Sequence, residues 1–224
     1  MTKQVLHVGC GATAPGKLHP AFESDAWSEL RLDIDCAVLP DIVASMTDMS
    51  PVPDASVDAV FSSHNLEHLY PHEVPVALAE FRRVLKPDGF ALITLPDLQE
   101  VARLVAAEGL EATAYLSALG PIRPLDILFG YRGALANGNL FMAHHTGFTS
   151  ASLMSALGEA GFAATTVQRV PSSFSLWAIG FCAQPTPQAL ETAQNRMLPL
   201  HAAFLAAFPA AALTAARSLE LEQA

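Results

Sequence analysis

Positively charged residues are scarce in this chain. Of 224 residues only 12 are Lys or Arg, against 22 Asp or Glu, and the formal net charge is −10. The few cations form no dense basic stretch. We therefore expect neither nucleic acid nor an anionic membrane surface as a partner, because phosphate groups are bound by clustered Lys and Arg.

Cysteines and long apolar runs are also scarce. The three cysteines, Cys10, Cys36 and Cys182, are far apart, odd in number and without zinc-site spacing, which indicates a reducing compartment. No apolar run reaches the ~20 residues of a membrane span. The N-terminus runs straight into a strand-like segment with no signal-peptide pattern. These absences predict a cytoplasmic protein.

The first hundred residues alternate between strand and helix patterns. Half of the chain is hydrophobic (51%) and only 15% is charged, which is typical of a folded domain. Strands are expected at residues 4–8, 29–35, 41–45, 57–63 and 90–96, with a helix at about 73–85. This alternation favours a doubly wound α/β sheet, whose ligands lie beyond the carboxyl ends of the strands.

The pattern changes after residue 97. Residues 98–118 look helical, whereas residues 119–148 are irregular and rich in Gly and Pro, as functional insertions often are. A helix capped by Thr149 or Ser150 and stopped at Gly161 follows, and then two strands that can pair antiparallel.

These patterns set the expected domain boundaries. We expect one domain over residues 1–183, with a cap insertion at about 98–148, and a helical extension over 184–224. The extension is rich in Ala and Leu and would expose a large apolar patch if left free. It is expected to pack on the domain or on a second copy, so a homodimer is one possible assembly.

The first loop, in "VLHVGCGATAPG", points to a bound cofactor. Gly9, Gly11 and Ala14 satisfy the dinucleotide pattern G-x-G-x-x-A, with an acid about 20 residues later. Glycines let backbone N–H groups approach a ligand closely. The loop alone fits either a nicotinamide dinucleotide or S-adenosylmethionine, so the cofactor stays open at this point.

Several longer stretches carry a family resemblance. They are "VLHVGCGA", "LRLDID", "PVPDASVDAVFSSHNLEHL", "EFRRVLKPDGFALITLPD" and "HHTGFTSASLMSALGEAGF". Over residues 4–183 the chain resembles the class I S-adenosylmethionine-dependent methyltransferases. The resemblance implies a three-layer Rossmann-like fold with strand order 3-2-1-4-5-7-6 and an antiparallel seventh strand. It also implies S-adenosylmethionine as cofactor, and methyl transfer to oxygen or nitrogen of a small or medium-sized acceptor.

The resemblance also assigns cofactor-binding residues. Gly9 and Gly11 would pass beneath the methionine moiety, and Asp33 would bind the ribose, with Asp35 as the second choice. The other implied contacts are Ser45 and Met46 at the adenine, and Ser63 and His64 near the sulfonium.

Two positions depart from the family pattern. His7 stands where the family usually has an acid, and Ser45 stands where another acid usually faces the adenine; Asp48 could replace the latter. These departures keep open a second reading, a non-catalytic or regulatory S-adenosylmethionine-binding module of the same fold. A nicotinamide oxidoreductase, a third reading, rests on the glycine pattern alone.

Histidines are the candidate catalytic residues. His64 would position the acceptor or take its proton, because imidazole titrates near neutrality, and His144 is the second candidate. His64 and His68 lie one helical turn apart beside Glu67, which is a spacing that metal-binding histidines use. Since "LEHL" is widespread in the family without a metal, we expect no metal here.

The segment Pro121–Phe148 is expected to cap the methyl-donor site. Because it lies beyond the fifth strand, it falls on the ligand side of the sheet. Its polar residues Asp126, Tyr131 and Arg132 are candidate acceptor contacts, and Phe129, Leu140, Phe141 and Met142 are the candidate apolar lining.

Overall fold

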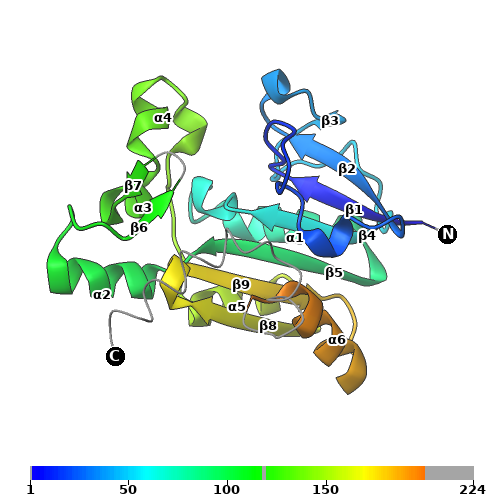
Figure 1. Cartoon of the computed structure of the whole chain (residues 1–224). Helices are drawn as coiled ribbons and strands as arrows, with labels where there is room; N and C mark the ends of the chain where they lie inside the picture. Colours follow the sequence, from blue (N-terminus) through cyan, green and yellow to red (C-terminus); the bar gives the residue numbers. More distant parts are fainter. Residues whose placement is uncertain (1, 118–119, 200–224) are drawn as a thin grey trace.

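The computed structural model describes residues 2–117 and 120–199 (Figure 1). Its main sheet has seven strands in the order β3-β2-β1-β4-β5-β9-β8. The strands are β1 (Lys3–Val8), β2 (Trp27–Asp33), β3 (Ile42–Val43), β4 (Val57–Ser63), β5 (Leu85–Pro96), β8 (Ala164–Val170) and β9 (Ser175–Phe181). Strands β1 to β5 are parallel, and β9 runs antiparallel to both β5 and β8. The predicted strand order, with its antiparallel last strand, is confirmed.

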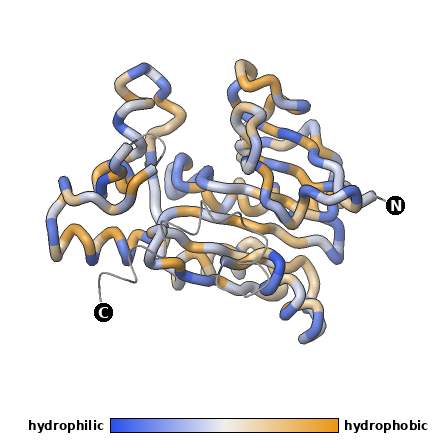
Figure 2. Tube along the Cα trace, in the orientation of Figure 1, coloured by the Kyte–Doolittle hydropathy of each residue, from blue (hydrophilic) through white to orange (hydrophobic). Residues whose placement is uncertain are grey.

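Side chains of successive strand residues pack on opposite faces of this sheet. Leu6 of β1 belongs to the larger hydrophobic cluster, whereas its neighbour Val5 belongs to the cluster on the other face. Ile93 and Leu92 of β5 divide in the same way, as the period of two along a strand requires. β5 is apolar on both sides because it lies inside the sheet, and Figure 2 shows hydrophobic residues along the central strands.

Helices cover both faces of the sheet. α1 (Val74–Val84) and α5 (Ser150–Glu159) contact each other and contribute to the larger cluster. The opposite face is covered by η1 (Pro20–Phe22) and by the end of α6 (Pro187–Met197). The connection from β1 to β2 therefore has only a 3-10 turn as its helical element.

The helix α5 begins and ends where the sequence predicts. The Thr149 hydroxyl accepts a hydrogen bond from Ser152 N at 3.3 Å, and the Ser152 hydroxyl accepts one from Thr149 N at 2.9 Å. Two of the otherwise unpaired N–H groups at this end are thereby satisfied. Gly161 follows the helix with φ +87°, a conformation that favours glycine.

A cap lies beyond the carboxyl end of β5 (Figure 1). Its elements are α2 (Leu98–Glu108), β6 (Tyr115–Ser117), β7 (Gly120–Ile122), α3 (Pro124–Phe129), α4 (Arg132–Ala136) and η4 (Leu140–Met142). The predicted helix over 98–118 is wrong beyond Glu108, because the chain turns at Gly109 with φ +91° and then forms the β6–β7 hairpin. A separate small cluster joins Val101, Ala114, Ile122 and Ile127.

The helical extension is described only in part. α6 carries Met197 and is followed by Leu198, and both are buried in the second hydrophobic cluster. This part of the extension packs on the domain; residues 200–224 lie outside the described residues. Over residues 2–117 and 120–199, no helix has both the length and the apolar character to cross a membrane.

Candidate active site

The glycine loop after β1 is locked to the end of β4 by Asn65. Its side-chain Nδ2 donates to the carbonyl oxygens of Val8, at 2.9 Å, and Ser63, at 3.0 Å. Gly9 has φ +66°, and a Cβ there would lie 2.0 Å from Asn65 Oδ1. The close packing of Asn65 is therefore sufficient by itself to require a glycine at position 9. Sequence reasoning missed Asn65, which stands between two candidate histidine motifs in "SSHNLEHL".

Gly11 and Asp33 meet at the end of β2. Gly11 N donates to Asp33 Oδ2 at 2.8 Å, and Asp35 N donates to Oδ1 at 2.9 Å. A carboxylate has about four lone-pair sites, so about two remain for a ligand's hydroxyl groups. A Cβ on Gly11 would meet only Lys17 Nζ, at 3.9 Å, so space is open beside this backbone. The open backbone and the spare acceptors fit an adenosyl ribose.

Arg31 is a second residue that sequence reasoning did not single out. Its guanidinium donates to the Gly11 carbonyl and, at 3.0 Å, to the Leu39 carbonyl. Its backbone N donates to Asp41 Oδ2 at 2.8 Å. Arg31 thus ties the glycine loop to the turn before β3. The only signal in the sequence is a cation inside the strand "LRLDID".

The other predicted cofactor contacts already have local partners. Ser45 Oγ lies 2.8 Å from Thr47 Oγ1, and Ser63 Oγ lies 2.8 Å from Thr94 Oγ1. Met46 is half-buried against the larger hydrophobic cluster. The two hydroxyls hold the strand ends in place, and they can still accept a hydrogen bond from a ligand.

His7, the first departure from the family pattern, has a structural explanation. It is 3% exposed, its Nδ1 lies 2.6 Å from Glu29 Oε1, and its ring packs on Phe61 with centroids 5.0 Å apart. Burial lowers the pKa of His7, although Glu29 opposes the shift. His7 therefore cross-links β1 and β2 within the sheet.

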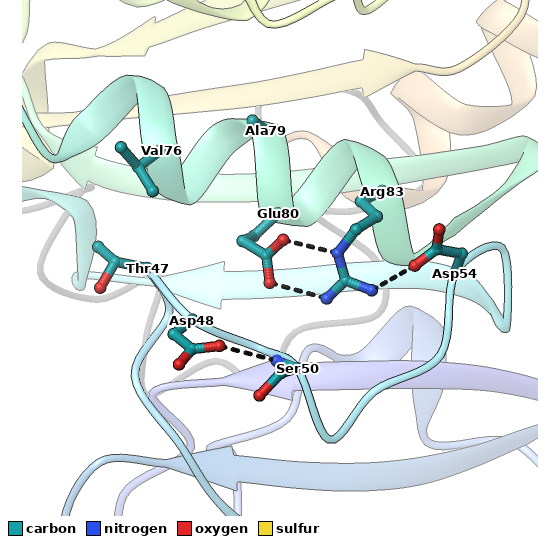
Figure 3. A pocket seen from close by; sticks show the side chains of 8 residues that line it. All are labelled: Thr47, Asp48, Ser50, Asp54, Val76, Ala79, Glu80 and Arg83. Atoms are coloured by element: carbon teal, nitrogen blue, oxygen red, sulfur yellow. Dashed lines mark hydrogen bonds and ion pairs between the residues drawn. The ribbon is translucent and has the colours of Figure 1, made fainter.

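A surface hollow of about 480 Å³ lies between α1 and the segment before β4 (Figure 3). Its polar side is organised by Arg83, which donates to Glu80 at 2.6 and 2.7 Å and to Asp54 at 2.6 Å. The pKa of Arg83 is raised, chiefly by the hydrogen bonds to Glu80. Asp48 also lines this hollow, and its Oδ1 accepts from Ser50 N. Asp48, the candidate substitute for the adenine-facing acid, is the one predicted cofactor residue among the lining residues of this hollow, and none of the candidate catalytic histidines lines it.

A second cavity, of about 200 Å³, lies between the strand ends and the cap. The sheet side contributes residues that follow β4 and β8 and the last residue of β5, and the cap contributes residues from β6 to the segment after η4. The lining residues are His64, Glu67, His68, Pro96, Tyr115, Ile122, Asp126, Ile127, Tyr131, Met142, His144, Ser173 and Phe174. Both candidate catalytic histidines therefore face one cavity, as the prediction of a cap over this edge requires.

Glu67 is the buried charge of this cavity. It is 1% exposed, and its carboxylate oxygens lack well-formed hydrogen bonds. His64 Nδ1 lies 3.3 Å from Glu67 Oε1, an ion-pair distance, and the His64 side chain is 53% exposed. Burial raises the pKa of Glu67, but the close contact with His64, the charges of His64 and His68 and the backbone N–H of Glu67 together outweigh burial, so the pKa lies below its usual value. His64 itself has φ +55°, which is uncommon for a residue with a side chain.

His144 is held by the cap backbone. Its Nδ1 lies 2.8 Å from the carbonyl oxygen of Ile127, which can only accept, so Nδ1 carries a proton in this contact. Burial lowers the pKa of His144, and nearby Glu67 opposes the shift. The ring of His144 packs on that of His68, with centroids 4.8 Å apart. A neutral His144 therefore offers the lone pair of Nε2.

The predicted apolar lining of the cap is only partly correct. Met142 lines the cavity, whereas Phe129, Leu140 and Phe141 are not lining residues and are 61%, 72% and 58% exposed. The apolar lining comes instead from Tyr115 of β6, Ile122 of β7 and Phe174 of the β8–β9 turn.

The polar cap residues also fall into two groups. Tyr131 and Asp126 line the cavity, whereas Arg132 does not. Asp126, 6% exposed, accepts hydrogen bonds from Arg132 Nε at 2.9 Å and from Arg123 N at 3.0 Å. Asp126 therefore serves to join α3 to α4, and Arg132 is directed to that carboxylate.

Known protein structures share this fold. The crystal structure of the PH0226 protein from Pyrococcus horikoshii OT3 has a TM-score of 0.53 and 16% identity, covering 81% of this chain and 83% of that chain. An S-adenosylmethionine-dependent methyltransferase from Archaeoglobus fulgidus gives 0.51 and 14%, covering 80% and 86%. The citrinin polyketide synthase CMeT domain structure gives 0.53 and 14%; 82% of this chain is covered, but only 47% of that one.

Sequence comparison adds a family. No curated protein matches the chain, but the family described as "Methyltransferase domain" matches residues 6–93. That segment contains the glycine loop, Asp33 and the end of β4 that faces the cavity. This match covers less than half of the chain; with the strand order of the sheet, it supports a class I S-adenosylmethionine-dependent methyltransferase domain with S-adenosylmethionine as its cofactor.

Proposed function

We propose that this chain transfers the methyl group of S-adenosylmethionine to an oxygen or nitrogen atom of a small or medium-sized acceptor. The observation that carries the proposal is the cavity of about 200 Å³ between the strand ends and the cap. It adjoins the strand end that carries Ser63 and His64, which the family resemblance sets beside the sulfonium. A small cavity lined by both polar and apolar side chains suits a small molecule better than a polymer.

The cofactor site is proposed to follow the family pattern. Gly9 and Gly11 would pass beneath the methionine moiety, and Asp33 would accept hydrogen bonds from the ribose hydroxyls. Ser45 and Met46 would flank the adenine, and Ser63 and His64 would lie near the methyl group. When bound, the cofactor supplies an activated methyl group on a sulfonium, so the protein mainly has to align the acceptor and exclude water.

The acceptor would be oriented by residues from both sides of the cavity. His64 and His144 are the proposed contacts for the acceptor's O–H or N–H group, because both line the cavity. Tyr131 and Met142 would form the cap side. We further propose residues 1–183 as the catalytic unit, with the cap at about 98–148 inside it. The cytoplasmic location and a homodimer remain predictions.

Transfer of a labelled methyl group tests the proposal. The full chain is incubated with S-adenosylmethionine and a panel of small alcohols, phenols and amines, and labelled products are identified by mass spectrometry. We expect product formation with release of S-adenosylhomocysteine. Tyr131→Ala and Met142→Ala should raise the acceptor KM or lower kcat at least tenfold, or about 1.4 kcal/mol. Phe141→Ala, on an exposed cap residue, is the matched control and should resemble the wild type.

Two outcomes would overturn the proposal. Binding of S-adenosylhomocysteine without transfer to any acceptor class would favour the non-catalytic module of the same fold. Equal turnover by the wild type, Tyr131→Ala and Met142→Ala would show that the acceptor does not occupy this cavity.

A further inference from the structure

Three potential metal ligands converge at the floor of the acceptor cavity. Glu67, His68 and His144 each offer one ligand atom, and these atoms all lie within 4.8 Å of one another. Glu67 is buried, and the two histidines are half-buried. The cluster joins the 3-10 helix η3 (Leu66–His68), which follows β4, to the segment after η4, so it bridges the domain and its cap.

Backbone hydrogen bonds hold the two segments together. His145 N and Thr146 N both donate to the carbonyl oxygen of Glu67, at 2.8 and 3.2 Å. His68 Nδ1 lies 3.0 Å from the Ala143 carbonyl oxygen. The residues on both sides of His144 are fixed in this way. The backbone therefore places the His144 imidazole near Glu67.

The ring nitrogens and carboxylate oxygens of this cluster carry more lone pairs than there are N–H groups to bind them. His144 Nδ1 donates to Ile127, which leaves the Nε2 lone pair without a proton. His68 faces carbonyl oxygens with both ring nitrogens, at 3.0 and 3.1 Å, although a neutral imidazole has only one N–H. Glu67 adds a carboxylate at 1% exposure whose oxygens lack well-formed hydrogen bonds, with His64 Nδ1 3.3 Å from Oε1 as a close partner. A buried carboxylate is costly unless its charge is paired, so a cation would stabilise this arrangement.

We propose that Glu67, His68 and His144 bind one divalent transition-metal ion, with Zn²⁺ as the reference ion. Two imidazoles and one carboxylate form a ligand set that catalytic zinc sites use, with a further position open to substrate. Ligand atoms of tetrahedral Zn²⁺, with bonds of about 2.0–2.1 Å, lie roughly 3.4 Å apart, so the cluster would contract on binding. This site departs from the metal-free site that the sequence predicts.

The ion would activate the acceptor. A metal-bound hydroxyl loses its proton far more readily than a free one, and the metal also orients the bound oxygen. In the proposed step the acceptor O–H bond breaks and its proton leaves to solvent. The freed electron pair then forms the bond to the methyl carbon as the carbon–sulfur bond breaks. This chemical role rests on the proposed function, whereas binding of the ion does not.

Titration with Co²⁺ and Zn²⁺ tests the site without turnover. The full chain is stripped with a chelator and titrated with Co²⁺, whose visible absorption reports nitrogen and oxygen ligation, and with Zn²⁺ in a calorimeter. We expect one ion per chain. Loss of partners that merely orient a metal ligand weakens binding about 10–100-fold, so Glu67→Gln and His144→Ala should each weaken it about 100-fold or more.

Matched controls separate ligation from folding. His72→Ala changes an exposed histidine outside the cluster and should leave ion binding unchanged. Circular dichroism and S-adenosylhomocysteine binding check that each variant is folded; if Glu67→Gln does not fold, His144→Ala carries the test. No Co²⁺ or Zn²⁺ binding by the wild type would overturn the proposal and favour a protonated imidazole as the partner of Glu67. Equal binding by the wild type and the folded variants would overturn it too.

Activity measurements on the same protein distinguish the metal-site proposal from the proposed methyltransferase function. Methyl transfer that proceeds equally in chelator-treated and Zn²⁺-loaded enzyme would refute the metal's role and leave the methyltransferase activity standing. Ion binding in a chain that transfers no methyl group would give the reverse result.

Discussion

The proposed cofactor site at the strand ends (the cofactor side) and the cavity under the cap are built in different ways. On the cofactor side, the key groups are backbone atoms and short side chains at strand ends, such as Gly11 and Asp33, which the sheet register brings together. Where the cap meets the sheet, the groups are long side chains from segments far apart in sequence, such as Glu67 and His144. The family match ends at residue 93, before α2 begins at Leu98. The cofactor side therefore lies within the family match, while the cap lies outside it.

The largest expected effect is on the cap. Gly130 has φ +99° and ψ 154°, and a Cβ there would lie 2.0 Å from the Met142 carbonyl oxygen. Gly130→Ala should therefore destabilise the cap by about 3 kcal/mol or more, combining backbone strain with a clash against backbone. Chemical denaturation and hydrogen exchange of cap amides measure this effect.

Gly138→Ala is the matched control for this change. Gly138 also has positive φ, +85°, but no atom lies within 4 Å of the position that a Cβ would occupy. Only the left-handed backbone penalty applies, about 1–2 kcal/mol. Equal losses of stability in the two variants would show that the residue after α3 does not pack closely on the end of η4. The cap would then not be the rigid structure described here.

The second expected effect is a loss of folding stability at acid pH, caused by a buried histidine beside the sheet. His19 is 3% exposed, its Nδ1 accepts from Ala21 N at 3.1 Å, and burial lowers its pKa from 6.5 to about 4. Between those values the unfolded chain binds more protons than the folded one, so stability falls as pH drops from about 6.5 to about 4. A pKa shift of this size corresponds to a loss of roughly 3 kcal/mol in the free energy of unfolding.

Unfolding curves between pH 7 and pH 4 check this prediction. His19→Asn keeps an acceptor for Ala21 N and removes the titration, so its stability should depend less on pH than that of the wild type. His72→Asn, on an exposed residue, should keep the wild-type slope. If His19→Asn and the wild type have the same slope, the buried neutral histidine does not govern acid stability.

A smaller effect is expected at the cofactor. Asp33→Ala removes the acceptor for Gly11 N and the proposed acceptor for the ribose hydroxyls, and should weaken S-adenosylhomocysteine binding at least tenfold, or about 1.4 kcal/mol. Asp35→Ala is the control, because the Asp35 side chain caps Ala37 N on the exposed turn. Calorimetric titration distinguishes them. A larger loss in Asp35→Ala would move the ribose contact to the second-choice acid.

Most of the fold was predictable from the sequence because it depends on local patterns. The strand at residues 57–63 and the helix α5 follow from apolar periodicity and capping residues, and the structure confirms both. The helix from Leu98 was predicted about ten residues too long. Its apolar pattern continues past Gly109, but the backbone turns there and the β6–β7 hairpin forms instead.

The site was less predictable because its partners are distant in sequence. Nothing local to Glu67 indicates that His145 N will bind its carbonyl oxygen, or that His144 will lie beside its carboxylate. Arg169 is a similar case, since its hydrogen bond to buried Asp97, at 2.5 Å, spans 72 residues. Composition and periodicity give residue types and faces, but only tertiary packing decides which charges meet.

The central claim is that the proposed cofactor site is separate from the cavity under the cap, and S-adenosylhomocysteine affinity tests it most directly. The dissociation constant is measured by calorimetry for the wild type, Asp33→Ala and Tyr131→Ala under one set of conditions. The account predicts at least tenfold weaker binding for Asp33→Ala and a change of no more than about twofold for Tyr131→Ala, because a shift below about 0.5 kcal/mol is typical away from the contact. Equal weakening in both variants, or binding of a nicotinamide dinucleotide in place of S-adenosylhomocysteine, would contradict it.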